Sequence, residues 1–233
     1  MCKLFAIGDL HLSVNNPKPM DIFGPRWDNH WDKIKEDWRE KVGPDDIVLI
    51  PGDISWAMYL ENAVSDLQLI GGLPGTKVLL RGNHDYWWKS ISAVRASLPA
   101  GMYAVQNDAL RWGKYVIFGS RLWSAPETPG VFETPEDKTI YLRETERLKL
   151  SIQAALKIKK DGDIPICMTH YPPFNARKKD SDYTALIERS GAAACVYGHL
   201  HGLTGKNEPF IKNNVTYHLT SCDMAGNKLV RIY

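Results

Sequence analysis

Short apolar runs alternate with longer amphipathic segments over the first part of the chain. Three continuous apolar runs predict strands that are covered on both faces: Lys3–Gly8, Asp46–Pro51 and Thr76–Leu80. The segments between and after them have the spacing of helices: Trp31–Lys41, Glu61–Leu73 and Ser90–Leu98. This alternation of strand and helix favours a layered α/β fold.

The pattern changes in the middle of the chain. Met102–Asn107 and Ala109–Ser120 predict short strands, the second of them a hairpin. Ser124–Asp137 is rich in Pro, Thr and Glu and predicts a loop. Thr134 then has the position of a helix N-cap, and the helix that it starts should run to about Lys160.

Strand-like runs return in the last third. Ile164–Thr169 and Ala193–Tyr197 predict strands, with a short helix at Tyr183–Ser190 between them. Val215–Thr220 and Lys228–Ile232 have the pattern of a closing hairpin. Because no repeat or linker interrupts the pattern, we expect residues 1–233 to form a single domain.

Composition narrows the class of protein. The 29 Lys and Arg residues nearly balance the 27 Asp and Glu residues, and a net charge of +2 argues against a broad nucleic-acid surface, while a local basic patch and a nucleic-acid substrate stay open. No apolar stretch reaches the roughly 18–20 residues needed to span a bilayer, and the N-terminus lacks the pattern of a secretory signal. The 4 cysteines form no CxxC pair. We therefore expect reduced thiols in a cytoplasmic protein.

Five of the 7 histidines follow directly on predicted strands, together with aspartates and an asparagine. The five motifs, in chain order, are Asp9-Leu10-His11, Gly52-Asp53, Gly82-Asn83-His84-Asp85, His170 and Gly198-His199-Leu200-His201. In open α/β sheets, ligand sites form at the carboxyl ends of the strands, so these side chains should share one edge. Glycine precedes a motif residue at Gly8, Gly52, Gly82 and Gly198, where we expect backbone conformations that other residues avoid.

Carboxylates and imidazoles together suit divalent transition metals such as Mn, Fe or Zn. No cysteine belongs to the set, which disfavours a structural thiolate zinc site. The set offers too many candidate ligands for one open site, whereas two ions sharing a carboxylate would use them. Two metals about 3.5–4 Å apart form the usual clamp for phosphoryl transfer to water. A single Asp-x-His or a lone His after a strand also fits a hydrogen-bonded structural residue, but packing does not explain all five motifs in this order.

The ordered set resembles the calcineurin-like metallophosphoesterase superfamily, over residues 3 to about 201. The resemblance implies a four-layer α/β/β/α sandwich of two mixed β-sheets and a compact bacterial-type phosphohydrolase. It implies two divalent metal ions, with a bridging hydroxide that attacks the phosphorus of a phosphodiester or phosphomonoester. The implied ligands are Asp9, His11 and His201 for one metal, Asn83, His170 and His199 for the other, and Asp53 as the bridge between them.

The resemblance also separates His84 from the ligands, which the motif spacing alone does not. His84 would stabilise developing charge or protonate the leaving oxygen, and Asp85 would orient its ring and favour its charged form. After Gly52-Asp53 the chain continues Ile54-Ser55-Trp56 instead of the Tyr-Val-Asp-Arg-Gly of serine/threonine protein phosphatases. Two alternatives stay open: a phosphoprotein phosphatase, and a non-catalytic metal-dependent interaction scaffold, which the complete ligand set disfavours.

Other residues near the motifs are candidates for binding a phosphorylated small molecule or a phosphodiester. Asn175 and Arg177 follow His170 closely and are the candidate substrate-binding residues, although Arg177-Lys178-Lys179 also fits a solvated loop. Four of the 8 tryptophans lie near motifs and would either wall a cleft or pack in the core: Trp56, Trp87, Trp88 and Trp123.

Overall fold

The computed structural model describes residues 2–15 and 17–233. One sheet contains the strands Leu4–Ala6 (β1), Ile47–Pro51 (β2), Thr76–Leu80 (β3), Met102–Ala104 (β4) and Val230–Arg231 (β11). Their order is β11-β1-β2-β3-β4, and β11 alone is antiparallel to its neighbour. The three predicted N-terminal strands therefore lie side by side and parallel.

A second sheet contains Ala109–Trp112 (β5), Tyr115–Ser120 (β6), Ile164–Thr169 (β7), Ala194–Tyr197 (β8), Phe210–Lys212 (β9) and Val215–Leu219 (β10). Its order is β5-β6-β7-β8-β10-β9. The four central strands are parallel, and the two edge strands β5 and β9 are antiparallel to them. Both sheets are thus mixed, as the family resemblance implies.

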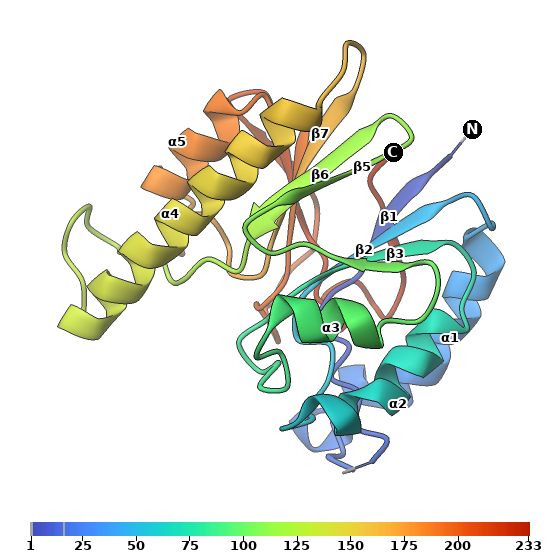
Figure 1. The fold of residues 1–233 in the computed structure, drawn as a ribbon. Helices are drawn as coiled ribbons and strands as arrows, with labels where there is room; N and C mark the ends of the chain where they lie inside the picture. The colour runs from blue at the N-terminus through green and yellow to red at the C-terminus, as the bar shows by residue number, and fades with distance from the viewer. Residues whose placement is uncertain (1, 16) are drawn as a thin grey trace.

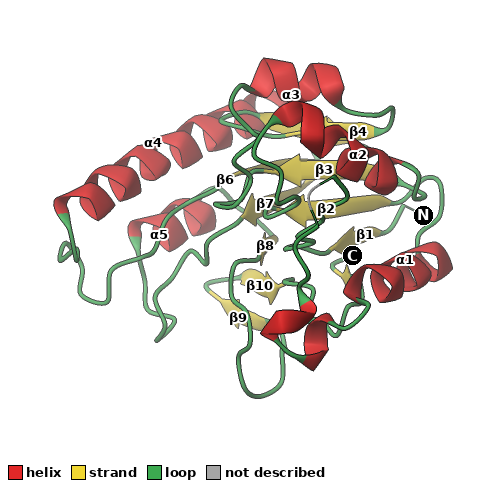
Figure 2. Cartoon of the chain, turned by 90° about the horizontal axis from the view of Figure 1, so that it is seen from below, coloured by secondary structure: helices red, strands yellow, loops and turns green. Residues whose placement is uncertain are grey.

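Helices cover the outer faces of the two sheets, which gives the four layers of the predicted α/β/β/α sandwich (Figure 1). His30–Lys41 (α1), Leu60–Gly71 (α2) and Ile91–Ser97 (α3) lie on the first sheet, and Pro135–Ile158 (α4) and Asp182–Arg189 (α5) lie on the second (Figure 2). Two short 3-10 helices, Asp21–Phe23 and Pro25–Trp27, precede α1. No helix among the described residues is long and apolar enough to cross a membrane.

Three apolar clusters fill the spaces between these layers. Leu4 and Leu49 of the first sheet meet Ile117 and Val196 of the second in the central cluster. The alternate residues of the same strands, such as Val48, face the helices instead. Because strands alternate their side chains between two faces, burial of both faces explains why these strands read as continuous apolar runs.

The predicted closing hairpin of Val215–Thr220 and Lys228–Ile232 is wrong. β10 instead forms a hairpin with β9, through a two-residue turn at Asn213 and Asn214, which have φ of 47° and 67°. A turn with positive φ at both central residues matches the twist of paired strands, and asparagine tolerates that conformation. β11 crosses to the other sheet and pairs with β1. The segment between β10 and β11 therefore passes from one sheet to the other.

The long helix α4 starts where the sequence predicts. The Thr134 hydroxyl accepts a hydrogen bond from the backbone N–H of Asp137 at 3.0 Å, which confirms the N-cap. The segment in front of it has no helix or long strand, as expected for the predicted loop. The predicted strand Met102–Asn107 is shorter in the structure and ends at Ala104.

Candidate active site

The carboxyl ends of the parallel strands of both sheets meet at one edge, and the seven predicted ligands lie together there. Asp9 and His11 follow β1, Asp53 follows β2, and Asn83 follows β3. The second sheet contributes the remaining three from the ends of β7 and β8: His170, His199 and His201. Contacts among these residues confirm the prediction that the motifs meet at one edge.

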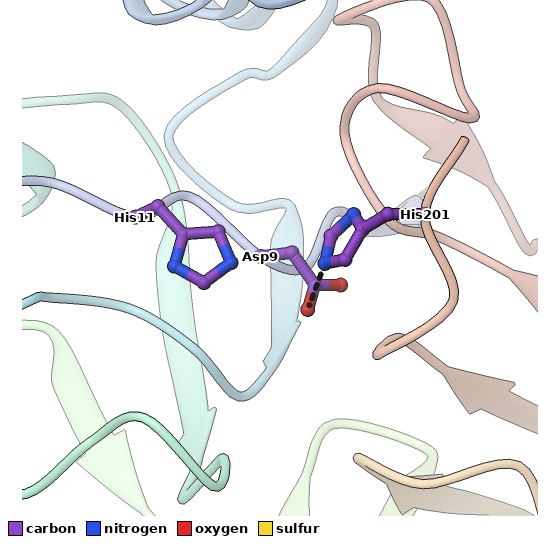
Figure 3. A group of neighbouring side chains, drawn as sticks. All are labelled: Asp9, His11 and His201. Atoms are coloured by element: carbon purple, nitrogen blue, oxygen red, sulfur yellow. Dashed lines mark ion pairs between the residues drawn. The ribbon is translucent and has the colours of Figure 1, made fainter. Parts of the chain in front are cut away.

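Asp9, His11 and His201 form the first group that could hold a metal ion (Figure 3). One ligand atom from each residue lies within 4.8 Å of the others. His201 Nε2 is 3.5 Å from Asp9 Oδ1, and the rings of His11 and His201 are 5.6 Å apart. Asp9 is fully buried, so its carboxylate is separated from solvent by its imidazole neighbours.

The second group contains Asp9, Asp53 and His170, again with ligand atoms within 4.8 Å of one another. The Asn83 amide adjoins this group, because its Oδ1 is 2.6 Å from His170 Nε2 and 3.0 Å from His199 Nδ1. The two groups share Asp9. They are also linked by Asp53, whose Oδ2 lies 3.5 Å from His170 Nε2 and 3.8 Å from His11 Nε2.

Burial in this cluster shifts the pKa values of its titratable side chains in opposite directions. Burial and the nearby carboxylates of Asp9 and Asp85 raise the pKa of Asp53 to about 9. Burial lowers the pKa of His11 and of His199 to about 3, so these rings are neutral at neutral pH. Neutral imidazoles and buried carboxylates are the ligands that divalent transition metals take, and a bound cation would offset the cost of burying the carboxylates. The residues therefore fit a divalent-metal site.

Four of the ligands have left-handed backbone conformations, at φ of 58° for Asp9, 47° for His11, 51° for Asp53 and 70° for His199. Backbone bonds hold two of these turns: the Asp9 N–H donates to the Gly52 carbonyl and the His11 N–H to the Asp53 carbonyl, each at 3.0 Å. Such conformations cost about 1–3 kcal/mol each and persist where the surrounding structure fixes them. The backbone strain at this edge of the sheets therefore lies mainly in the ligand residues and not in the glycines that precede them.

The expected role of the motif glycines holds only for Gly52, which has φ of 93°. The prediction is wrong for Gly8, Gly82 and Gly198, none of which has positive φ. A Cβ atom at Gly82 would collide with the Asp53 carboxylate, and one at Gly198 would collide with the Asp9 carboxylate. These two positions need glycine because a ligand lies directly against the backbone.

Asp223 is a site residue that the motifs missed. Its Oδ1 is 2.8 Å from His201 Nδ1, and its Oδ2 accepts a hydrogen bond from the Gly202 N–H at 2.9 Å. Burial opposes protonation of His201, but the bonds to Asp223 and Asp9 raise its pKa to about 10. A carboxylate behind a ligand imidazole fixes the ring and its tautomer. Asp223 follows the predicted strand Val215–Thr220, so the strand-end rule that found the other residues could have found it.

Asp85 does not orient His84, which corrects the prediction from the resemblance. Its buried carboxylate accepts hydrogen bonds from four donors: the N–H groups of Ile54 at 2.9 Å, Ser55 at 3.1 Å and Gly82 at 2.7 Å, and the Trp87 indole at 3.0 Å. These bonds tie the loop after β2 to the loop after β3. Asp85 therefore positions the backbone that carries Asp53 and Asn83, because three of its four donors are N–H groups of that backbone.

His84 lies beside the ligands with its ring half-buried. Its backbone N–H donates to Asp53 Oδ1 at 2.8 Å, and its ring centroid is 4.6 Å from that of Trp56 and 5.8 Å from that of His11. Nδ1 is buried without a hydrogen-bond partner among the described residues. Burial lowers the pKa of His84, so the expected bias toward the charged ring is absent in this environment.

The four tryptophans near the motifs have different surroundings. Trp87 and Trp88 are fully buried in the core beneath the first sheet. Trp56 stacks on His11 with ring centroids 4.7 Å apart, and Trp123 lines a large cavity next to the site. Core packing therefore holds for Trp87 and Trp88 and also for Trp56, which packs against the same apolar cluster, whereas Trp123 walls a cleft.

Asn175 and Arg177 lie in the loop after β7, and neither side chain bonds to the ligand set within the described residues. Asn175 Oδ1 accepts from the N–H groups of Arg177 and Lys179, each at 3.1 Å, and its amide nitrogen reaches the carbonyls of Pro126 and Glu127 at 3.4 Å. The Arg177 side chain is 75% exposed and 3.9 Å from the Glu127 carboxylate. Asn175 thus braces the loop beside the cavity, and Arg177 lies on its outer surface.

Comparison with known proteins adds to this geometry. The sequence profile of the calcineurin-like phosphoesterases matches residues 2–203. The chain belongs to this family. A calcineurin-like phosphoesterase is a metal-dependent phosphoester hydrolase, and the two groups of candidate ligands at the strand ends agree with that activity.

This calcineurin-like phosphoesterase is similar to the following three proteins at low sequence identity. It is 24% identical over 205 residues to the Gene 66 protein of Mycobacterium phage D29, covering 86% of this chain and 79% of that protein. Its fold is similar to that of TT1561 of Thermus thermophilus, with a TM-score of 0.60, 14% identity and coverage of 99% and 98% of the two chains. The phosphopantetheinyl hydrolase of Mycobacterium tuberculosis has a TM-score of 0.58, 15% identity and coverage of 99% and 95%. These structures confirm the fold.

Proposed function

We propose that this calcineurin-like phosphoesterase uses two divalent ions, of Mn, Fe or Zn, to hydrolyse a phosphodiester or a phosphomonoester. The position of Asp53 carries the proposal, since one of its oxygens lies within 4 Å of a histidine from each ligand group. A carboxylate in that position can bind two cations at once. In this assignment one ion is held by Asp9, His11 and His201, the other by Asn83, His170 and His199, and Asp53 bridges them.

Two such ions would lower the pKa of a water molecule and neutralise charge on the phosphoryl oxygens. The chain itself supplies rigid placement of the donors. His170 Nδ1 lies 3.0 Å from the Pro51 carbonyl, and His201 Nδ1 lies 2.8 Å from Asp223, so that the Nε2 atom of each ring faces the site. Placement of this kind keeps the donors in the geometry that the cations require before substrate arrives.

His84 is assigned the proton transfer to the leaving oxygen. It has no ion pair in the described structure, and its half-buried ring reaches the surface next to the ligands. The bond from its backbone to Asp53 Oδ1 fixes its position relative to the bridge. A negatively charged phosphoester beside the ring would favour the protonated form that burial alone disfavours.

The test is metal analysis combined with a hydrolysis panel. Purified protein, reconstituted separately with Mn, Fe and Zn, should bind two equivalents per chain and hydrolyse bis-aryl phosphate or aryl phosphate. His218→Gln is a suitable control, because His218 is a buried histidine of β10 outside the ligand set and should leave both metals in place. A single bound equivalent at saturation would contradict the dinuclear assignment, whichever ester is cleaved.

A further inference from the structure

A cavity of about 810 Å³ opens directly beside the metal ligands. Its inner end is formed by His199 and by Tyr171, whose ring centroid lies 3.9 Å from that of His199. From there it extends between three segments of the second sheet's side: 123–137, 171–178 and 197–208. The volume falls within the range of about 300–1,000 Å³ that is typical of sites for drug-sized ligands.

Hydrogen bonds between the walls hold this cavity open. The Asn175 amide joins the 171–178 segment to the carbonyl of Pro126 in the facing segment. The Asn207 amide donates to the carbonyls of Leu219 at 3.0 Å and Met224 at 3.3 Å, which fixes the third segment against the end of β10. Since the walls are braced independently of any ligand, the cavity is preorganised for binding.

Apolar side chains provide most of the lining. The aromatic rings of Trp123, Phe132 and Phe174 are joined by two aliphatic residues that stay exposed, Val131 at 63% and Leu203 at 43%. Val131 and Leu203 come from different walls of the cavity. Exposed apolar groups that line a cavity next to a reactive centre favour an apolar occupant, because its arrival removes their surface from water.

The charges that line the cavity disfavour a polyanion. Four carboxylates line it: Glu127, Glu133, Asp137 and Glu208. Two lysines line it as well, Lys178 over the ring of Phe210 at 4.1 Å and Lys206 with Glu208 at 3.9 Å, and Arg177 lies outside the cavity at 3.9 Å from Glu127. A chain of phosphates lying in this cavity would meet an excess of negative charge, whereas an uncharged organic group would not.

We propose that the cavity binds the organic part of the substrate, and that this part is a large, uncharged and mainly apolar group such as an alkyl, acyl or aryl chain. The inference rests on the proposed function, because it places the phosphoester at the metal ligands and the organic group along the wall from Tyr171 to Leu203. The substrate class is therefore a phosphoester of an extended apolar alcohol, and a polynucleotide is disfavoured.

A series of alkylphosphonates tests this without requiring turnover. Methyl-, butyl-, octyl- and dodecylphosphonate share one headgroup for the metal site and differ only in the length of the chain. Binding to the metal-loaded enzyme is measured by titration calorimetry. The dissociation constant should fall about two- to fourfold for each methylene that enters the cavity, which is the range set by apolar burial. A ten-nucleotide single-stranded DNA should bind no more tightly than a dinucleotide.

Truncation of two cavity side chains together tests whether the alkyl chain of the phosphonate lies in the cavity. Val131→Ala with Leu203→Ala should weaken dodecylphosphonate about tenfold and leave methylphosphonate unchanged. Both side chains are exposed, so their truncation should not affect folding. Leu150→Ala is the matched control, because Leu150 is 51% exposed on α4 and does not line the cavity. It should leave the whole series unchanged.

The outcomes separate this inference from the function on which it rests. Equal affinity for all chain lengths, or tighter binding of the longer DNA, overturns the apolar-substrate inference, while aryl phosphate hydrolysis by the same sample still supports the dinuclear enzyme. A chain-length dependence that the double truncation does not reduce also overturns it, since the chain would then lie elsewhere. Absence of metal-dependent hydrolysis overturns the proposed function instead.

Discussion

The loops that follow β1, β2 and β3 hold their ligands against backbone, whereas the loops that follow β6, β7 and β8 enclose a cavity. Three of the four ligands with positive φ, Asp9, His11 and Asp53, belong to the first sheet, and the Asp85 carboxylate ties two of its loops together. The cavity is lined entirely by residues between 123 and 224, on the side of the second sheet. In the proposed site the first sheet supplies four of the seven ligands, and the second sheet supplies the other three together with the cavity, so that the cavity can change while the ligands of the first sheet stay constant.

Asp53→Asn should have the largest effect, because it acts at the point where the first sheet holds both ligand groups together. Loss of the carboxylate charge should release metal and lower the rate of hydrolysis by about 10³-fold or more. The reason is that the cations contribute several kcal/mol to stabilisation of the transition state. Metal content by mass spectrometry checks it. Asp108→Asn is the control, since Asp108 pairs with Arg95 at the surface. Two ions bound at wild-type affinity would rule out the bridging role.

His84→Ala should separate proton transfer from metal binding. Metal content should stay at the wild-type value, and hydrolysis should fall by about 10²–10⁴-fold, the usual contribution of a general acid. The measurement pairs metal analysis with kcat on one aryl ester. Wild-type turnover in the variant would remove His84 from the mechanism.

Asp223→Asn tests whether a residue on the side of the second sheet helps to hold the proposed ligand His201 in place. The amide keeps the size of the side chain but loses the charge that holds His201. Affinity for metal should fall about 10–100-fold, with hydrolysis recovered when metal is added in excess. Competition with a chelating dye measures the affinity. If the affinity does not change, Asp223 has only a structural role.

Asn175→Ala should have the smallest effect and should be confined to the cavity. Loss of the hydrogen bonds across the loop, each worth about 0.5–1.5 kcal/mol, should raise KM up to about tenfold with kcat and metal content constant. Steady-state kinetics on a long-chain ester checks it. A loss of bound metal would show that the two halves are coupled more closely than their contacts indicate.

The features that the sequence predicts best are those that depend on neighbouring residues in the chain, such as strands, helix starts and motifs at strand ends. Continuous apolar runs gave the central strands, and Thr134 marked the start of the long helix. Motifs at strand ends brought together all seven candidate ligands, because parallel strands deliver their carboxyl ends to one edge.

The errors concern pairings between distant segments. The run at Val230–Arg231 has the pattern of a hairpin partner, yet it crosses to β1, and nothing in its own residues specifies that choice. The family resemblance implies that Asp85 orients its sequence neighbour His84, whereas the Asp85 carboxylate accepts hydrogen bonds from the N–H groups of a different loop. Gly82 and Gly198 needed glycine for the space occupied by side chains far away in sequence, which no local pattern reveals.

The left-handed backbone at Asp9, His11, Asp53 and His199 has a consequence for the evolution of this chain. Glycine would adopt these conformations without the steric cost, but it would also remove a ligand. A library of variants selected for heat resistance alone should therefore accumulate glycine at these positions and lose its metals. Only selection that also demands catalysis would retain the four side chains. Selection for thermal tolerance therefore favours glycine at these positions, whereas selection for turnover favours the ligand side chains.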